Sequence, residues 1–401
     1  MHELALFIAI LGQIPPPEQL PADDIKPFHD EIERIEERML ETAGDKPTVL
    51  YALARTWAAG KEYRKAFEVL EKVAALRVGL DPSNDPIFDK IKGAKEYQRL
   101  LDTVRADTPR ISRSTVAFTI DEEGLAPEGM AYSPRLRRFL LGSVVRPKIV
   151  SCRFDGKCHT LVAEGRDGLG EVLGLRVDPR DGTLWVANNT AAQVGVFHYA
   201  LPSGQLIRKY TGDRKGREFN DLAVDLLGNV FITDSAGGAV YWIDHQKDRL
   251  ELFNPALQIH GANGITLSGT GKLYVAGFPD GITVVDVASR SFHAMAHPPN
   301  LCLATIDGLY FSNDSLYAIQ NSVMVHRAVR FHLTPELDAI DGFEILERRN
   351  PLFDGPTTAA LMEGAFYLVA NPQTDKVKPG DRLQPLKVLR IDLTTKRKQK
   401  P

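Results

Sequence analysis

The sequence predicts a mainly β fold, a six-bladed β-propeller preceded by a small α-helical domain. Six short phrases, each opening an apolar strand, recur at intervals of 43 to 47 residues. That period is the length of one four-stranded propeller blade. Five phrases are clear and the last is weaker; in order they are Glu128-Gly129-Met130, Leu173-Gly174-Leu175, Asn220-Asp221-Leu222, Asn263-Gly264-Ile265, Asp307-Gly308-Leu309 and Asp354-Gly355.

A second strand follows each phrase, and in five blades it has an apolar-aromatic-apolar core. These cores are Leu184-Trp185-Val186, Val230-Phe231-Ile232, Leu273-Tyr274-Val275, Leu316-Tyr317-Ala318 and Phe366-Tyr367-Leu368, with a plainer Phe139-Leu140-Leu141 in the first blade. Turn residues such as Asp181-Gly182 precede them, which is typical of β-hairpins. The strand Thr115–Ile120 has no partner in the first blade. We expect it to pair with the last blade, because closing the propeller removes exposed sheet edges.

The chain before the propeller has helical periodicity. We expect an α-helical region over 18–105, a linker over 106–113 and the propeller over 114–395. Two amphipathic segments on either side of Gly60 predict an αα-hairpin.

The hairpin carries the residue pattern of a tetratricopeptide unit, which it resembles. The small, small, aromatic, small and large positions of that pattern are Ala58, Gly60, Tyr63, Ala66 and Leu70. Only one unit is visible, and a solenoid of such repeats needs about three. A helical cap or docking domain is therefore favoured over a peptide-binding groove, and a protein partner for this region is an expectation.

Residues 1–17 begin with an apolar run, Leu4–Leu11, that resembles the central part of a signal peptide. No Lys or Arg precedes the run, so a truncated signal peptide and a short buried helix both stay open. The run favours an exported or periplasmic location over a cytoplasmic one. Cys152 and Cys158 flank a turn at Asp155-Gly156, where both a cross-strand disulfide and two free thiols stay open.

Charge and hydropathy exclude two kinds of partner. Charged residues make up 25% of the chain and hydrophobic residues 43%, which is ordinary for a globular protein. The net charge of −3 gives no electrostatic basis for binding nucleic acid. No apolar run reaches the ~18 residues that a membrane-spanning helix needs. We therefore expect neither a nucleic-acid partner nor a membrane span.

Four of the five clear phrases begin with an oxygen-bearing side chain: Glu128, Asn220, Asn263 and Asp307. In a closed propeller, equivalent positions meet at the central axis, so these side chains converge on one mouth of the channel. Two carboxylates balance one divalent cation, and the Asn amides add neutral oxygens, a donor set that suits Ca²⁺. The sequence predicts one such cation here. Asn and Asp are also common in turns at strand starts, which is the alternative for any single position.

The phrases around these positions resemble the senescence marker protein (regucalcin) and gluconolactonase family of six-bladed propellers. The motifs are PEGMAY, FNDLAVD, GNVFITDS, ANGITLS and IDGLYF, and the resemblance spans 115–393. It implies that Glu128, Asn263 and Asp307 are metal ligands, and that Asp307 is also the catalytic base. Asn220 would hold substrate or act as a fourth ligand. Family enzymes often carry an Arg two residues before that Asn, where this chain has Glu218. The resemblance therefore does not specify a sugar lactone.

We expect a calcium-dependent hydrolase of a lactone or related ester. Loops on the same rim carry the expected substrate-binding residues besides Asn220, which are Asn188, Asp234, His260 and Asn321. The rival is a non-catalytic propeller that binds a ligand or a protein and keeps a metal for structure, because a propeller fold by itself implies no chemistry. Hydrolysis of a lactone panel, with calcium and after chelation, separates the two.

Overall fold

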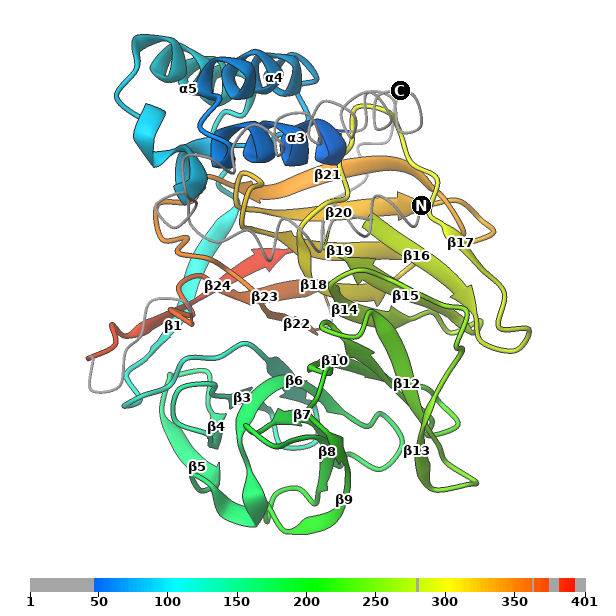
Figure 1. The fold of residues 1–401 in the computed structure, drawn as a ribbon. Coiled ribbons are helices and arrows are strands. Elements are labelled where there is room, and N and C mark those ends of the chain that lie inside the picture. The colour runs from blue at the N-terminus through cyan, green and yellow to red at the C-terminus, as the bar shows by residue number, and fades with distance from the viewer. Residues whose placement is uncertain (1–46, 279–280, 363, 375–381, 394–401) are drawn as a thin grey trace, which may run out of the picture. The chain divides into compact units, whose positions relative to one another are not determined.

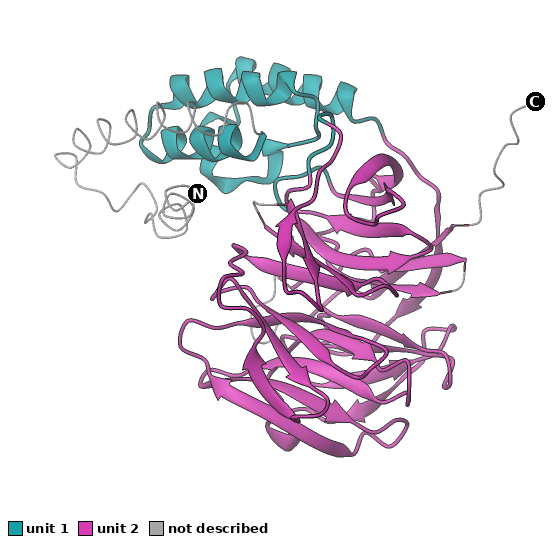
Figure 2. Cartoon of the chain, turned by 90° about the vertical axis from the view of Figure 1, so that its right-hand side faces the viewer, with its two compact units in different colours: residues 1–109, 299–302, 322–325 teal, residues 110–298, 303–321, 326–401 magenta. Residues whose placement is uncertain are grey.

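The computed structural model describes residues 47–278, 281–362, 364–374 and 382–393. The apolar start and the first part of the predicted helical region, up to residue 46, lie outside them. The chain divides into two compact units, which Figure 2 colours separately. No helix in the described ranges is both long and apolar enough to cross a membrane.

The helical unit contains the predicted αα-hairpin. Helix α3 (Pro47–Ala59) and helix α4 (Tyr63–Ala75) are separated by the break at Gly60, as the sequence predicts. Helix α5 (Lys95–Asp107) follows two short 3₁₀ helices, Pro82–Asn84 and Pro86–Ile91. The apolar faces of the three α-helices form the buried part of this unit, which includes Leu53, Trp57, Ala66, Leu70, Tyr97 and Leu101. The tetratricopeptide character of the hairpin stays a prediction.

Two short stretches from between propeller strands belong to the helical unit, residues 299–302 and 322–325. The second stretch pairs with the chain between α4 and α5. Leu80 and Met324 form a β-bridge, and the Asp81 N–H donates to the Val323 carbonyl over 2.8 Å. The helical unit is therefore assembled from three parts of the sequence, while the predicted domain boundaries at 105 and 113 stay predictions.

The second unit is a six-bladed propeller, as predicted, and each blade is one four-stranded antiparallel sheet (Figure 1). Blades 1 to 3 are formed in chain order by β2 (Met130–Ser133), β3 (Arg138–Gly142), β4 (Ile149–Cys152) and β5 (Cys158–Val162); by β6 (Glu171–Val177), β7 (Leu184–Asn189), β8 (Gln193–Tyr199) and β9 (Leu206–Asp213); and by β10 (Phe219–Val224), β11 (Val230–Asp234), β12 (Ala239–Asp244) and β13 (Arg249–Leu252).

The other three blades repeat this arrangement, and the last one is closed by the first strand of the chain. They are formed by β14 (Ala262–Leu267), β15 (Lys272–Gly277), β16 (Gly281–Asp286) and β17 (Phe292–Ala294); by β18 (Ile306–Ser312), β19 (Ser315–Gln320), β20 (Arg327–Leu333) and β21 (Ile340–Arg348); and by β22 (Ala359–Met362), β23 (Ala365–Val369), β24 (Leu386–Asp392) and β1 (Ser114–Ile120). Strand β1 pairs antiparallel with β24, which confirms the predicted closure.

The hydrophobic core of the propeller lies between blades. One apolar cluster, for example, joins Phe139 of blade 1 to Val388 of blade 6, and another joins Val186 of blade 2 to Leu140 of blade 1. The aromatic residues at the centres of the second strands are buried, as with the fully buried Phe231. Because each blade buries its faces only against its neighbours, the repeated apolar pattern fixes both the blades and their order around the axis.

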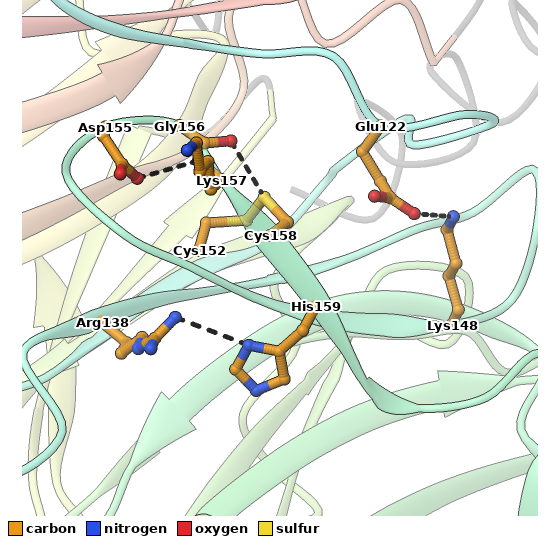
Figure 3. The surroundings of a disulfide bond; sticks show 9 residues. All are labelled: Glu122, Arg138, Lys148, Cys152, Asp155, Gly156, Lys157, Cys158 and His159. Atoms are coloured by element: carbon orange, nitrogen blue, oxygen red, sulfur yellow. Dashed lines mark hydrogen bonds and ion pairs between the residues drawn. A yellow bond between two sulfur atoms is a disulfide. The ribbon is translucent and has the colours of Figure 1, made fainter.

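A disulfide joins Cys152 to Cys158, so the first of the two alternatives for these cysteines is the one found (Figure 3). The two residues are cross-strand partners of β4 and β5. Between them, Asp155 accepts a hydrogen bond from the Lys157 N–H over 3.1 Å, which shapes the turn. Disulfides persist in oxidising compartments and are rare in the cytosol, so the bond favours an extracytoplasmic location.

Candidate functional site

Strand register identifies the six equivalent positions at the channel mouth. In every blade, the third residue of the second-strand core pairs with one residue of the innermost strand. The six innermost-strand residues in these pairs are Met130, Leu175, Leu222, Ile265, Leu309 and Ala359. The residues two places earlier form a set that we call the ring: Glu128, Leu173, Asn220, Asn263, Asp307 and Thr357. Four ring members are the predicted ligands. The sixth predicted start, Asp354-Gly355, is wrong by three residues, because Thr357 holds the equivalent position.

A break in strand pairing frees most ring residues from the ladder. In blades 2 to 5 the register between the first two strands shifts across the ring position, as between Phe219 and Leu222 or between Ile306 and Leu309. Such bulges leave residues unpaired and redirect their side chains. Because the shift recurs at equivalent positions, we infer that Asn220, Asn263 and Asp307 turn toward the same end of the channel.

Close backbone approach between blades explains the glycines that follow most ring positions. A Cβ on Gly129 would lie 1.9 Å from the Leu173 carbonyl oxygen, and one on Gly264 would lie 2.2 Å from the Asp307 carbonyl oxygen. Any side chain there would clash with the ring residue of the next blade. The glycines therefore let neighbouring ring positions come into contact around the axis.

Side chains from the rim hold the backbone immediately before Asn220. The Asn189 amide clamps Phe219, accepting from its N–H over 3.1 Å and donating to its carbonyl over 2.8 Å. The Asp234 carboxylate accepts the Glu218 N–H over 2.7 Å. These contacts place Asn220 without using its own amide, which leaves that amide available for a ligand as far as the described hydrogen bonds go.

The carboxylate of Asp307 is oriented by Asn321. The Asn321 amide donates to Asp307 Oδ2 over 2.6 Å and to the Pro356 carbonyl over 3.0 Å, which ties blade 5 to the loop that enters blade 6. Asn321 is one of the predicted substrate-binding residues. In the structure it reaches the site through Asp307.

The other predicted rim residues lie in different surroundings. Asn188 and Asp234 are only 2% and 1% exposed, and both accept backbone N–H groups, with Gly170 donating to Asn188 over 2.6 Å. They hold the rim loops, and a role in substrate binding stays a prediction. His260 is half-buried, and its carbonyl accepts the Phe278 N–H. Phe278 is 42% exposed and offers an apolar surface that the sequence analysis did not consider.

A polar network that the sequence analysis missed joins the innermost strands next to the ring. The Arg176 guanidinium of blade 2 donates to the Asp221 carboxylate of blade 3 over 2.8 Å. It also lies 5.2 Å from the ring centroid of Tyr310 in blade 5. Blades 2 and 5 face each other across a six-bladed propeller, so this cation–π contact spans the axis.

The same network continues to the remaining blades. Asp221 accepts the Ile265 N–H of blade 4 over 3.4 Å, and the Tyr310 hydroxyl accepts the Ala359 N–H of blade 6 over 2.7 Å. Thr358 of blade 6 accepts the Met130 N–H of blade 1 over 3.0 Å. All six blades therefore contribute to what we call the hub. The hub residues follow the ring positions by one to three places along the innermost strands.

Burial dominates the electrostatics of the hub. It raises the pKa of Asp221, and the Arg176 cation together with the N–H groups of Leu222 and Ile265 opposes that rise. Burial likewise raises the pKa of Tyr310, which keeps its hydroxyl protonated. An ion pair this deep is not by itself a source of stability, because desolvation offsets the attraction of the two charges.

The ring side chains fit a hard cation by their chemistry. Glu128 and Asp307 supply two carboxylates, and Asn220 and Asn263 supply two amide oxygens, which is the ligand type that Ca²⁺ takes. Within the described part of the chain, no group of three or more His, Cys, Asp or Glu is placed to hold a metal ion. The ring has two residues of those types, and the amides of Asn220 and Asn263 are its other two predicted ligands.

Comparisons with known proteins support the fold. No protein-family model matches the sequence, and no curated protein matches it either. Among solved structures, the major Malassezia sympodialis allergen Mala s 1 is similar, with 15% identity, a TM-score of 0.55, and coverage of 70% of this chain and 96% of that one. A protein provisionally assigned as a gluconolactonase has 14% identity and a TM-score of 0.50, covering 71% and 93%. A gluconolactonase from Xanthomonas campestris has 16% identity and a TM-score of 0.49, covering 70% and 94%. At these identities the likeness shows a shared propeller fold and assigns no activity.

Proposed function

We propose that this protein is a hydrolase of a lactone or related ester that works with one divalent cation, Ca²⁺, bound by the ring. The observation that carries the proposal is the register equivalence of Glu128, Asn220, Asn263 and Asp307. Four oxygen-bearing side chains at equivalent positions of a closed propeller are not what turn preferences alone would produce. A protein provisionally assigned as a gluconolactonase shares this fold, which makes lactones the first substrates to test.

Each ring side chain has a task that follows from its chemistry. A bound cation would polarise the ester carbonyl and stabilise the negative charge that develops on its oxygen. Glu128 and Asp307 would hold the cation by charge. Asp307, fixed by Asn321, would also accept the proton of the attacking water. Asn220 has an uncommitted amide that can donate to a substrate oxygen. The hub contacts that join blades across the axis would keep the substrate on the ring side.

The test combines cation binding with hydrolysis. We would titrate calcium calorimetrically into the full chain and into Glu128→Gln, Asp307→Asn and Asp354→Asn. The first two variants should bind at least roughly tenfold more weakly, because each loses a charged ligand. Asp354→Asn is the matched control, since it makes the same chemical change outside the ring, and it should bind normally. Equal affinity in all four proteins would refute the site.

Hydrolysis is then measured on a panel of lactones and esters with calcium and after chelation. Asn220→Ala should keep most of its bound calcium and lose roughly 10²–10³ in rate, the usual cost of removing one donor to a developing oxyanion. If calcium binds but the wild-type chain turns over nothing above background, the protein is a binding module with a structural metal.

A further inference from the structure

Thr357 is the sixth member of the ring, and the sequence analysis did not identify it. Ala359 pairs with Leu368 in blade 6 as Leu309 pairs with Ala318 in blade 5, so Thr357 is the counterpart of Asp307. Contact with the neighbouring blade agrees with this register. A Cβ on Gly308 would lie 2.8 Å from the Thr357 carbonyl oxygen, just as Gly129, Gly174 and Gly264 closely approach the ring residue of the next blade.

The hydroxyl of Thr357 is buried and has no hydrogen-bond partner. Thr357 is 6% exposed, and its Oγ1 has no hydrogen-bond partner among the described residues. The adjacent Thr358 is the opposite case, because its hydroxyl accepts the Met130 N–H over 3.0 Å and lies 3.3 Å from the Tyr310 hydroxyl. Buried polar groups in native proteins are nearly always satisfied, and an exception calls for an explanation such as an ion or a ligand.

The position of Thr357 indicates what would satisfy it. Around the ring it stands between Asp307 of blade 5 and Glu128 of blade 1, the two carboxylates of the set. A hydroxyl oxygen is a neutral donor of the kind that hard cations accept, and Ca²⁺ takes six to eight oxygens, more than the four predicted side chains provide singly.

We propose that Thr357 Oγ1 is an oxygen ligand of the cation in the ring, contributed by blade 6. The proposal rests on the proposed function in one respect, the presence of a cation. It adds a ligand that no motif in the sequence marks. It also implies that the metal-free protein is less stable than it would be without the buried, unpartnered hydroxyl. This loss of stability can be measured independently of any enzymatic activity.

Thr357→Val tests the proposal because valine has the same shape and lacks the hydroxyl. In the presence of chelator the variant should melt at the same temperature as the wild type or higher, since it removes an unsatisfied buried group. In calorimetric titration it should bind calcium roughly tenfold more weakly, and calcium should raise its melting temperature less. Thr357→Ser keeps the oxygen and should bind within roughly twofold of the wild type, because the ligand itself is unchanged.

Thr358→Val is the matched control. Its hydroxyl is already engaged, so this variant should melt lower than the wild type both with chelator and with calcium.

Two results would overturn the proposal: wild-type calcium affinity in Thr357→Val, or a lower melting temperature of Thr357→Val under chelation, which would mean that the hydroxyl is satisfied without the cation. If Thr357→Val binds calcium with wild-type affinity while Glu128→Gln binds it weakly, the Thr357 ligand is refuted but the calcium site of the proposed function is not. A wild-type chain that binds no calcium would refute both, and Thr357-dependent binding without hydrolysis would refute only the hydrolase.

Discussion

Replacing Arg176 by Met should make the stability of the propeller depend on pH. Arg176 is the cation that faces the Asp221 carboxylate in the hub, and the two side chains are only 19% and 11% exposed. Met keeps the length of the side chain and removes the charge. Breaking a buried ion pair by removing one partner typically costs ~3–5 kcal/mol. Because both side chains retain some exposure, we expect the lower end, about 3 kcal/mol at neutral pH.

The direction of the pH dependence follows from the pKa of Asp221. Burial raises that pKa, and Arg176 is the largest influence opposing the rise. Without Arg176 the folded-state pKa is higher still, so the folded chain binds more protons than the unfolded chain from about pH 3.9 upward. Stability therefore falls as the pH rises through this window. For each pH unit over which the folded chain binds one more proton than the unfolded chain, the free energy of unfolding falls by about 1.4 kcal/mol.

Urea unfolding at pH 5 and pH 8 measures this effect. The destabilisation of Arg176→Met relative to wild type should be at least about 1.4 kcal/mol larger at pH 8 than at pH 5. Asp221→Asn is the control, because it breaks the same pair but leaves no titrating group at position 221; its own free energy of unfolding should change less between the two pH values than that of Arg176→Met. Equal destabilisation of Arg176→Met at the two pH values would show that Asp221 does not carry a buried charge, and the hub would need another explanation.

Two further predictions concern the disulfide and the helical unit. The bond between Cys152 and Cys158 closes a short loop, with a sequence separation of 6 residues. Replacing both cysteines by Ser should therefore lower the free energy of unfolding by about 2 kcal/mol; denaturant curves of the variant and of the oxidised wild type measure this, and coincident curves would contradict it. A chain beginning at Arg110 should keep its β circular dichroism and melt cooperatively, because the propeller buries its core between its own blades. An insoluble or molten product would show that the two units cannot be separated.

The sequence determined the propeller because each blade repeats the same local requirements. A small residue after the ring position, a tight turn and an apolar-aromatic-apolar second strand all reflect packing between neighbouring blades, so they recur with the period of the blade. The same periodicity predicted the ring positions of Glu128, Asn220, Asn263 and Asp307, and the unpaired strand at the start of the propeller predicted its closure. The chemistry proposed for these residues still awaits its test.

Only the tertiary structure decided what depends on contacts between distant blades. Asp354-Gly355 looks like a ring phrase, but strand pairing in blade 6 moves the equivalent position to Thr357, which no repeated residue marks. In the sequence, Arg176 and Tyr310 are ordinary strand residues. The structure shows that they contact each other, because blades 2 and 5 face each other across the axis. The order of residues along a strand is written in the sequence. Which side chains meet at the axis depends on how all six innermost strands pack together, and a local sequence pattern does not specify those contacts.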